Sequence, residues 1–170
     1  MNIVLTGFMG TGKTVTAKKL AAALKMKYID IDEAIEADAK KSIALIFQEN
    51  GESHFREVEK KVIRCVALLD NFVISTGGGV VLKKENMDEL ETNGIVICLT
   101  AAPDVIYRRI KNTEYRPLLN VRNPQEKIKE LMEKRKPFYK RCSMMIDTSN
   151  MALDEVVEKI IQFINKSGKK

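Results

Sequence analysis

A glycine-rich loop near the start of the chain constrains the fold more than any other feature. The loop, GFMGTGKT at 7–14, has the spacing G-x-x-x-x-G-K-[ST]. An apolar run over residues 2–6 precedes it, and apolar residues at helical spacing follow over 13–25. A strand, a tight loop and a helix in this order are typical of a phosphate-binding unit in a sheet with helices packed on its faces.

The residue types in this loop match the chemistry of holding a triphosphate. Gly7, Gly10 and Gly12 permit a tight turn whose backbone N–H groups point into a concave nest. Lys13 brings a compact positive charge to the β- and γ-phosphates, and Thr14 offers a hydroxyl to Mg²⁺. The loop therefore indicates a nucleoside triphosphate, ATP or GTP, but it does not say what happens to the γ-phosphate.

Short apolar runs alternate with helical patterns along the rest of the chain, which predicts βα units around a parallel sheet. The predicted strands cover 2–6, 27–31, 71–75, 95–99 and 143–146. Helices are predicted over 13–25, 32–48, 52–70, 102–111 and 124–136, with a last helix carrying an apolar stripe from Leu153 to Ile164. The pair Asn50-Gly51 is the expected stop between two of these helices.

The composition narrows the class of protein. The 170 residues suit a single domain, and 45% apolar with 31% charged residues is a globular balance. No apolar run reaches the roughly 18 residues of a membrane span, and the start has no basic region or cleavage site, so we expect neither a membrane span nor a signal peptide. The widely spaced Cys65, Cys98 and Cys142 do not form a zinc-site pattern, and we interpret them as reduced thiols of a cytoplasmic protein.

The net charge of +6 is concentrated in one segment. Between Arg108 and Arg141 lie twelve basic and four acidic residues, a cluster that attracts anions. Only 6% of the residues are aromatic, and no run of aromatics suggests stacking on nucleic-acid bases. The segment therefore favours a nucleotide together with an acidic metabolite, while a nucleic-acid-binding module stays as an alternative interpretation.

Two carboxylates follow one another at the end of the second predicted strand. Asp30 and Asp32 are separated by one residue, so both can face the crevice at the carboxyl ends of the strands. Side-by-side carboxylates repel unless a cation or hydroxyl groups lie between them, which suits Mg²⁺ or a polyhydroxylated substrate. The alternative is that Asp32 only caps the helix that follows.

Several other residues allow both a binding role and a structural one. Arg56 and Glu59 share a helix face and form either part of a site or a surface ion pair. The glycines at 77–79 permit close approach of a ligand to the backbone. Arg116 is suited to the charge of a transferring phosphoryl group or is a solvated loop residue. Arg135 is near a predicted helix end, where it can satisfy the helix C-terminus.

Six segments resemble the shikimate kinase family in order and spacing, nearly from end to end. They are GFMGTGKT (7–14), YIDIDEAIE (28–36), IFQENGESHFREVE (46–59), STGGG (75–79), RPLL (116–119) and RKPFY (135–139). The first is common to many families, whereas the combination is much more specific. Departures at Tyr28, Phe138 and Cys142-Ser-Met remove no charged site residue, but they leave the base contacts after Ile146 open.

The resemblance implies a nucleoside-monophosphate-kinase-like α/β fold. It would have three layers, α/β/α, and a five-stranded parallel sheet in the order 2-3-1-4-5. One domain, 1–170, would comprise a P-loop core (1–31, 71–108 and 141–166), a helical substrate-binding segment (32–62) and a mobile lid (about 110–124). The implied reaction is ATP-dependent phosphorylation of the shikimate 3-hydroxyl, giving shikimate 3-phosphate and ADP, on the way to chorismate and aromatic amino acids. ATP and shikimate would be the partners of a monomer that binds neither nucleic acid nor a membrane.

The resemblance also implies a role for each candidate residue. Nucleotide contacts would come from Gly10, Thr11, Gly12, Lys13, Thr14, Val15, Arg109 and Arg116, with Arg109 stacking on adenine and Arg116 closing from the lid. Thr14 and Asp30 would hold Mg²⁺. Shikimate would be bound by Asp32, Arg56, Gly78, Gly79 and Arg135, and catalysis would depend on Lys13, Asp32 and Arg116. The runner-up is another P-loop metabolite kinase, gluconate-like or acting on nucleoside monophosphates, although those lack this pair of D-x-D and G-E-x-x-F-R segments.

Overall fold

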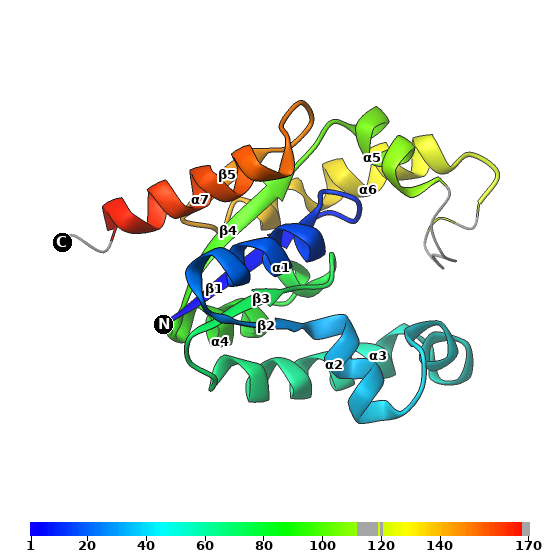
Figure 1. Ribbon diagram of the computed structural model, residues 1–170. Helices are drawn as coiled ribbons and strands as arrows, with labels where there is room; N and C mark the ends of the chain where they lie inside the picture. The colour runs from blue at the N-terminus through cyan, green and yellow to red at the C-terminus, as the bar shows by residue number, and fades with distance from the viewer. Residues whose placement is uncertain (112–118, 120, 168–170) are drawn as a thin grey trace.

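The protein is built around one five-stranded parallel sheet, shown with its flanking helices in the computed structural model of Figure 1. The structure describes residues 1–111, 119 and 121–167. The strands are β1 (Asn2–Gly7), β2 (Lys27–Asp30), β3 (Phe72–Ser75), β4 (Gly94–Thr100) and β5 (Met144–Asp147). Their spatial order is β2-β3-β1-β4-β5, which confirms the implied topology.

Helices cover both faces of the sheet, so the three-layer arrangement is also confirmed (Figure 1). They are α1 (Lys13–Leu24), α2 (Ile31–Ala39), α3 (Ile43–Ala67), α4 (Lys84–Thr92), α5 (Pro103–Ile110), α6 (Pro124–Tyr139) and α7 (Leu153–Ser167), with a 3₁₀ turn, η1 (Val80–Leu82). Helices α1 and α7 pack on one face, while α2 to α6 contribute to the core on the other. None of the described helices is long and apolar enough to cross a membrane.

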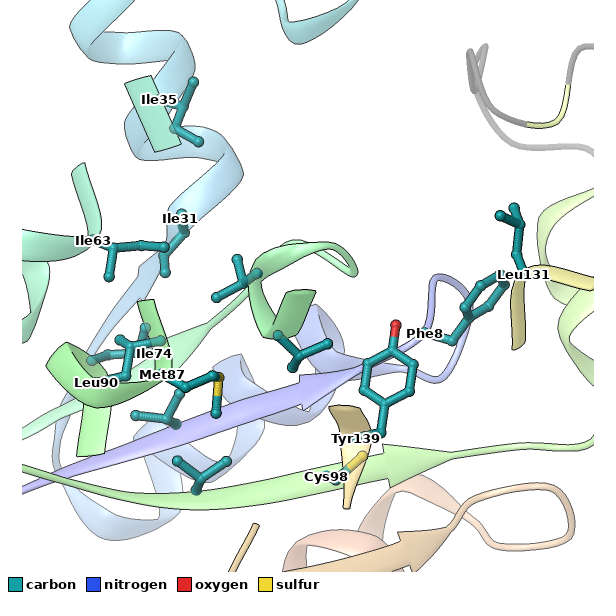
Figure 2. Packing of buried hydrophobic residues seen from close by; sticks show 14 of the residues in the cluster. Phe8, Ile31, Ile35, Ile63, Ile74, Met87, Leu90, Cys98, Leu131 and Tyr139 are labelled. Atoms are coloured by element: carbon teal, nitrogen blue, oxygen red, sulfur yellow. The ribbon is translucent and has the colours of Figure 1, made fainter. Parts of the chain in front are cut away.

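Successive side chains of the central strands point to opposite faces of the sheet, and this divides the core into two halves. In β1, Ile3 and Leu5 pack toward α1 and α7, whereas Val4 packs toward α3 and α4. Strand β4 divides in the same way, with Ile97 on the first face and Cys98 on the second. Both faces are buried, which explains why these strands read as continuous apolar runs. Figure 2 shows the second half, in which side chains from α2, α3, α4 and α6 meet the sheet.

The predicted single helix over 32–48 is wrong, because the chain turns between α2 and α3. Lys40 has a left-handed conformation (φ 53°, ψ 32°) that ends α2. Ser42 then begins α3, its side chain accepting a hydrogen bond from the N–H of Leu45 at 3.2 Å. The break expected at Asn50-Gly51 is instead a kink inside α3, where Gly51 has φ 77° and ψ 175°.

Helix α4 was not among the predicted elements. Its nine residues are mostly polar, and only Met87 and Leu90 supply large buried apolar side chains. Two such residues in nine give too short a repeat to identify a helix by periodicity. The helix is held by tertiary packing, since Met87 and Leu90 are 0% and 1% exposed against the core (Figure 2).

Candidate active site

The phosphate-binding loop (the P-loop, residues 7–14) connects β1 to α1 at the carboxyl edge of the sheet. Gly7 and Gly10 have φ values of 138° and 76°. A Cβ on Gly7 would lie 2.1 Å from the carbonyl oxygen of Leu99, and one on Gly10 would lie 2.7 Å from Cγ2 of Ile110. The loop conformation therefore requires glycine at both positions, for backbone angle and for space.

Lys13, at the first position of α1, lies within the P-loop. Its side chain is only 8% exposed, and Nζ donates a hydrogen bond to the carbonyl oxygen of Phe8 at 2.9 Å. The Thr11 hydroxyl donates to the same carbonyl at 2.7 Å. Next to Lys13 is a cavity of about 230 Å³, whose walls include Gly10, Gly12, Lys13, Thr14, Val15, Asp30, Asp32 and Gly78. Most of the residues predicted to contact nucleotide thus line one cavity with both aspartates.

Asp30 and Asp32 face the same cavity, as predicted, but they have different local roles. Strand β2 ends at Asp30, and the Asp30 carboxylate caps α2 by accepting from the N–H of Asp32 at 2.9 Å. The alternative that made Asp32 the cap is therefore wrong. Asp32 instead extends from the first turn of α2 toward Gly77, where a Cβ would come within 2.7 Å of its Oδ1.

The second oxygen of Asp30 lies between two hydroxyl groups. Thr14 Oγ1 donates to Asp30 Oδ2 at 3.1 Å, and the Tyr28 hydroxyl donates to it at 3.4 Å. Burial, with the nearby Asp30 carboxylate, raises the pKa of Tyr28, so this hydroxyl stays protonated as a donor. The Tyr28 hydroxyl thus adds a contact to Asp30 that a phenylalanine at this position would lack.

Thr14 and Asp30 fit a magnesium ion that is completed by a nucleotide. Both present hard oxygen donors beside the P-loop, which is the ligand type that Mg²⁺ prefers. Within the described residues no group of three or more His, Cys, Asp or Glu side chains could hold a metal. Mg²⁺ is usually held by one or two protein oxygens together with phosphates and water.

Arg56 belongs to a partly buried ion cluster that reaches from the buried Glu59 to the exposed Glu52, rather than to a surface pair. Its Nη1 donates to Glu59 at 2.9 Å and its Nη2 to Glu52 at 3.1 Å, and the Glu59 side chain is 1% exposed. Burial raises the pKa of Glu59 against the lowering effect of Arg56. Burial also opposes the charge on Arg56, but Glu59 and Glu52 outweigh it and raise the Arg56 pKa. Gly79 makes room for the guanidinium, since a Cβ there would lie 2.6 Å from both Nη atoms.

Arg135 extends from α6 to the glycine turn after β3, so it does not cap the end of its helix. The side chain is 5% exposed, Nη1 donates to the carbonyl oxygen of Gly78 at 3.3 Å, and the guanidinium lies 5.8 Å from the centre of the Phe8 ring. Helix α6 continues past the predicted end at 136, through Pro137, to Tyr139. Arg56 and Arg135 thus approach the same glycine turn from two helices.

Tyr139 is a site-wall residue that the sequence interpretation did not select. Its hydroxyl donates to the Gly78 carbonyl at 2.6 Å, and burial raises its pKa to about 12. Its spacing of four from Arg135 in RKPFY would have placed both residues on one helix face, had the helix been extended past Pro137. Figure 2 shows the ring beside Cys98 in the core.

Arg109 connects the P-loop to the segment after β5. Its Nη1 donates to the carbonyl oxygen of Gly10 at 3.3 Å and to Thr148 Oγ1 at 3.0 Å, while Nη2 donates to the Thr148 carbonyl at 2.7 Å. Thr148 belongs to none of the motifs identified in the sequence, so it was not predicted as a site residue. Arg116 and most of the predicted lid, 112–118 and 120, lie outside the described residues.

Comparison with known proteins agrees over nearly the whole chain. A family model described as shikimate kinase matches residues 9–165. Shikimate kinase of Thermoanaerobacter pseudethanolicus is 48% identical over 161 residues, covering 95% of this chain and 94% of that protein. Shikimate kinase of Caldanaerobacter subterraneus subsp. tengcongensis is 47% identical, with 99% of both chains covered. A solved structure of shikimate kinase from Acinetobacter baumannii in complex with shikimate matches with a TM-score of 0.95 at 34% identity, over 99% of this chain and 95% of that one. The chain belongs to the shikimate kinase family, whose members are ATP-dependent kinases.

Proposed function

We propose that this member of the shikimate kinase family transfers the γ-phosphoryl group of ATP to the 3-hydroxyl of shikimate. The products are shikimate 3-phosphate and ADP, within the pathway to chorismate. The proposal rests on one observation: a phosphate-binding loop and a pair of arginines meet at one edge of the sheet. A P-loop cavity containing Lys13 and Asp32 ends at the Gly78 turn, and Arg56 and Arg135 contact that turn.

On the nucleotide side, the protein acts mainly by positioning charge. Backbone N–H groups at 10–15 and the Lys13 ammonium cradle the phosphates, and Lys13 leaves the Phe8 carbonyl to do so. Thr14 and Asp30 would hold Mg²⁺, which when bound neutralises the phosphate oxygens. Arg109 contacts the adenine ring, and Arg116 closes over the phosphates from the lid.

On the acceptor side, the groups match the chemistry of shikimate. The acid has one carboxylate and three hydroxyls. Guanidinium groups of Arg56 and Arg135 bind the carboxylate, because a planar fork of donors fits two carboxylate oxygens. Gly78 and Gly79 offer backbone contacts, and Asp32 orients the attacking hydroxyl and accepts its proton. Glu59 holds Arg56 in place from the buried side.

The same arrangement argues against the competing functions. A nucleoside-monophosphate acceptor requires a second base pocket, whereas the cluster at Gly78 and Gly79 presents two guanidiniums suited to a carboxylate. The basic segment between Arg108 and Arg141 is partly used inside the protein, since Arg109, Arg135 and Arg141 all bind other parts of the chain. We therefore propose a cytoplasmic monomer that requires neither nucleic acid nor a membrane, with the P-loop core, the substrate-binding segment (32–62) and the lid (about 110–124) as its working parts.

A coupled assay of ADP release tests the function directly. With Mg-ATP and purified protein, shikimate is expected to raise ADP release far above the rate without it. Gluconate and nucleoside monophosphates, offered in the same assay, are expected to leave the rate at background. ADP release that does not depend on shikimate would refute the proposal, and a response to gluconate or a nucleotide would favour the runner-up.

A further inference from the structure

A second and larger cavity, of about 550 Å³, lies behind the P-loop. It is enclosed by α6, by the P-loop, and by the ends of β4 and β5. None of the residues that line it lines the smaller cavity with Lys13 and Asp32. Its volume is within the roughly 300–1,000 Å³ of small-molecule sites. It shares Phe8 and Thr11 with the P-loop but does not include Lys13, Thr14 or Asp30.

The inner wall of this cavity is apolar. It is formed by side chains from four separate elements: Phe8, Leu99, Ala101, Met132 and Met145. Met145 lies on the edge strand β5 and is 47% exposed, so part of its side chain is accessible to a ligand. A polyhydroxylated or phosphorylated ligand would lose its hydrogen bonds to water here without replacement. The wall therefore suits an apolar ligand body and neither substrate.

The mouth of the cavity is positively charged. Lys129 and Lys136 line it from α6 and Lys140 lines it from the C-cap of that helix, at spacings of seven and four that place them on one face. Glu133, the one acidic side chain among the described lining residues, pairs with Lys136 at 3.4 Å. Lys129 and Lys140 form no ion pair within the described part of the chain. Two ammonium groups thus remain to attract an anion at the edge of an apolar space.

We propose that this cavity is a binding site for a small organic anion with an aromatic or branched apolar body and one acidic group. The apolar body packs between Met132, Met145 and Phe8, and the acidic group reaches Lys129 and Lys140 at the mouth. The lining hydroxyls of Thr11, Thr100 and Tyr139 already donate to backbone carbonyls, so charge complementarity at the mouth and the largely apolar lining distinguish this ligand from shikimate and from nucleotides.

The position of the cavity connects such a ligand to the acceptor side of the active site. Tyr139 lines the cavity while its hydroxyl holds the Gly78 carbonyl at 2.6 Å. Phe8 lines the cavity while its ring supports Arg135. A ligand in contact with both side chains changes the affinity for shikimate, and by linkage shikimate changes the affinity for the ligand by the same factor. This regulatory part rests on the proposed roles of Gly78 and Arg135.

Binding can be tested with two fluorescent probes that share one apolar body. The anion 8-anilinonaphthalene-1-sulfonate is titrated into the full chain with Mg-ADP and shikimate present, and N-phenyl-1-naphthylamine serves as its uncharged counterpart. Saturable binding of about one anion per chain is expected, because both substrate positions are filled. An anion that fails to bind, or that ADP or shikimate displaces completely, would overturn the proposal.

Substitutions of lysines at the mouth of the cavity and elsewhere test where the probe binds. Lys129→Gln with Lys140→Gln is expected to weaken the anion about fivefold and leave the neutral probe unchanged, as loss of two exposed charge contacts implies. Lys134→Gln with Lys159→Gln removes the same charge elsewhere on the surface and is expected to change neither. Equal losses in the two double variants would mean that only net charge matters and would refute the site.

The regulatory part has its own readout. The KM for shikimate is measured over a series of anionic-probe concentrations up to saturation, in wild-type protein and in the Lys129→Gln/Lys140→Gln variant. We expect the probe to change the KM for shikimate in both proteins. The variant should need about fivefold more probe than the wild type for the same change. An unchanged KM in the presence of bound probe would overturn the coupling. The fluorescence titration needs no turnover, so it separates failure of this inference from failure of the proposed kinase function.

Discussion

The two sides of the site are assembled in different ways. On the nucleotide side, one continuous segment, 7–14, supplies the nest, and its shape is fixed by glycine backbone angles and by one buried lysine. On the acceptor side, three distant segments meet at the turn after β3. Arg56 comes from α3, Arg135 and Tyr139 come from α6, and Gly78 and Gly79 provide the meeting point.

The two sides of the site should therefore respond differently to substitutions. The backbone N–H groups of the P-loop keep their arrangement when the helices move slightly, because they lie within a few residues of one another. A site made of side chains from separate helices depends on how those helices dock. We therefore expect substitutions on the nucleotide side, and of the proposed base Asp32, to reduce kcat. Substitutions among the groups that meet at the glycine turn should change mainly the KM for shikimate.

Lys13→Ala is expected to have the largest effect. Removing the ammonium group from the phosphates should lower kcat at least about a thousandfold, at the upper end for loss of one charge-stabilising donor. The coupled assay measures the rate, and circular dichroism checks that the fold is kept. Lys19→Ala, on the exposed side of the same helix, is the control and should retain activity. Normal turnover in Lys13→Ala would remove Lys13 from the phosphate site.

Asp32→Asn should lower kcat about a hundredfold, because the amide cannot accept the hydroxyl proton. The matched control is Asp38→Asn on the same helix, whose carboxylate pairs with Lys61 at the surface. Both variants are compared at saturating ATP and shikimate. A loss smaller than about tenfold would show that the Asp32 carboxylate binds without acting in the chemical step.

Arg56→Ala should raise the KM for shikimate by roughly tenfold to a hundredfold, the range for losing a charge-assisted hydrogen bond. The KM for ATP should remain unchanged, so the ATP KM of the same variant is the internal control. Because Glu59 would lose its partner while buried, some loss of stability is expected too, and a thermal melt measures it. An unchanged shikimate KM would reduce Arg56 to a structural partner of Glu59.

Gly79→Ala tests the same contact without removing any charge. The added Cβ would meet both Nη atoms of Arg56 at 2.6 Å, so the guanidinium has to move. The backbone at Gly79 (φ −99°, ψ −8°) accepts alanine, and the fold should hold. We expect the shikimate KM to rise about fivefold to tenfold, less than in Arg56→Ala. A wild-type KM would mean that the position of the guanidinium is not critical.

The same contrast explains what could be predicted from the sequence. The P-loop and the central strands were identifiable because their signals are local: glycine spacing in the loop and apolar runs in β1 and β4. The sheet order came from the family resemblance, since no single segment encodes which strands become neighbours.

The errors occurred where packing between distant segments decides the structure. Helix α4 is stabilised by burial of Met87 and Leu90 and has little periodicity of its own. Asp30 takes the capping position that the alternative interpretation gave to Asp32, because the strand ends one residue earlier than the apolar pattern indicates. Tyr139 was missed because Pro137 suggested a helix end, whereas the buried tyrosine keeps the last turn in place.

Tyr139→Phe is the smallest and most discriminating change. It removes one hydroxyl from the Gly78 carbonyl and keeps the ring that packs beside Cys98 (Figure 2). Loss of one hydrogen bond, worth about 0.5–1.5 kcal/mol, should raise the shikimate KM about threefold with little change in kcat. Tyr107→Phe on α5 is the control for loss of a tyrosine hydroxyl. If kcat falls with KM unchanged, Tyr139 acts on the chemical step and the division between the two sides fails. If neither changes, Arg135 alone holds the glycine turn, and α6 positions the acceptor through one contact instead of two.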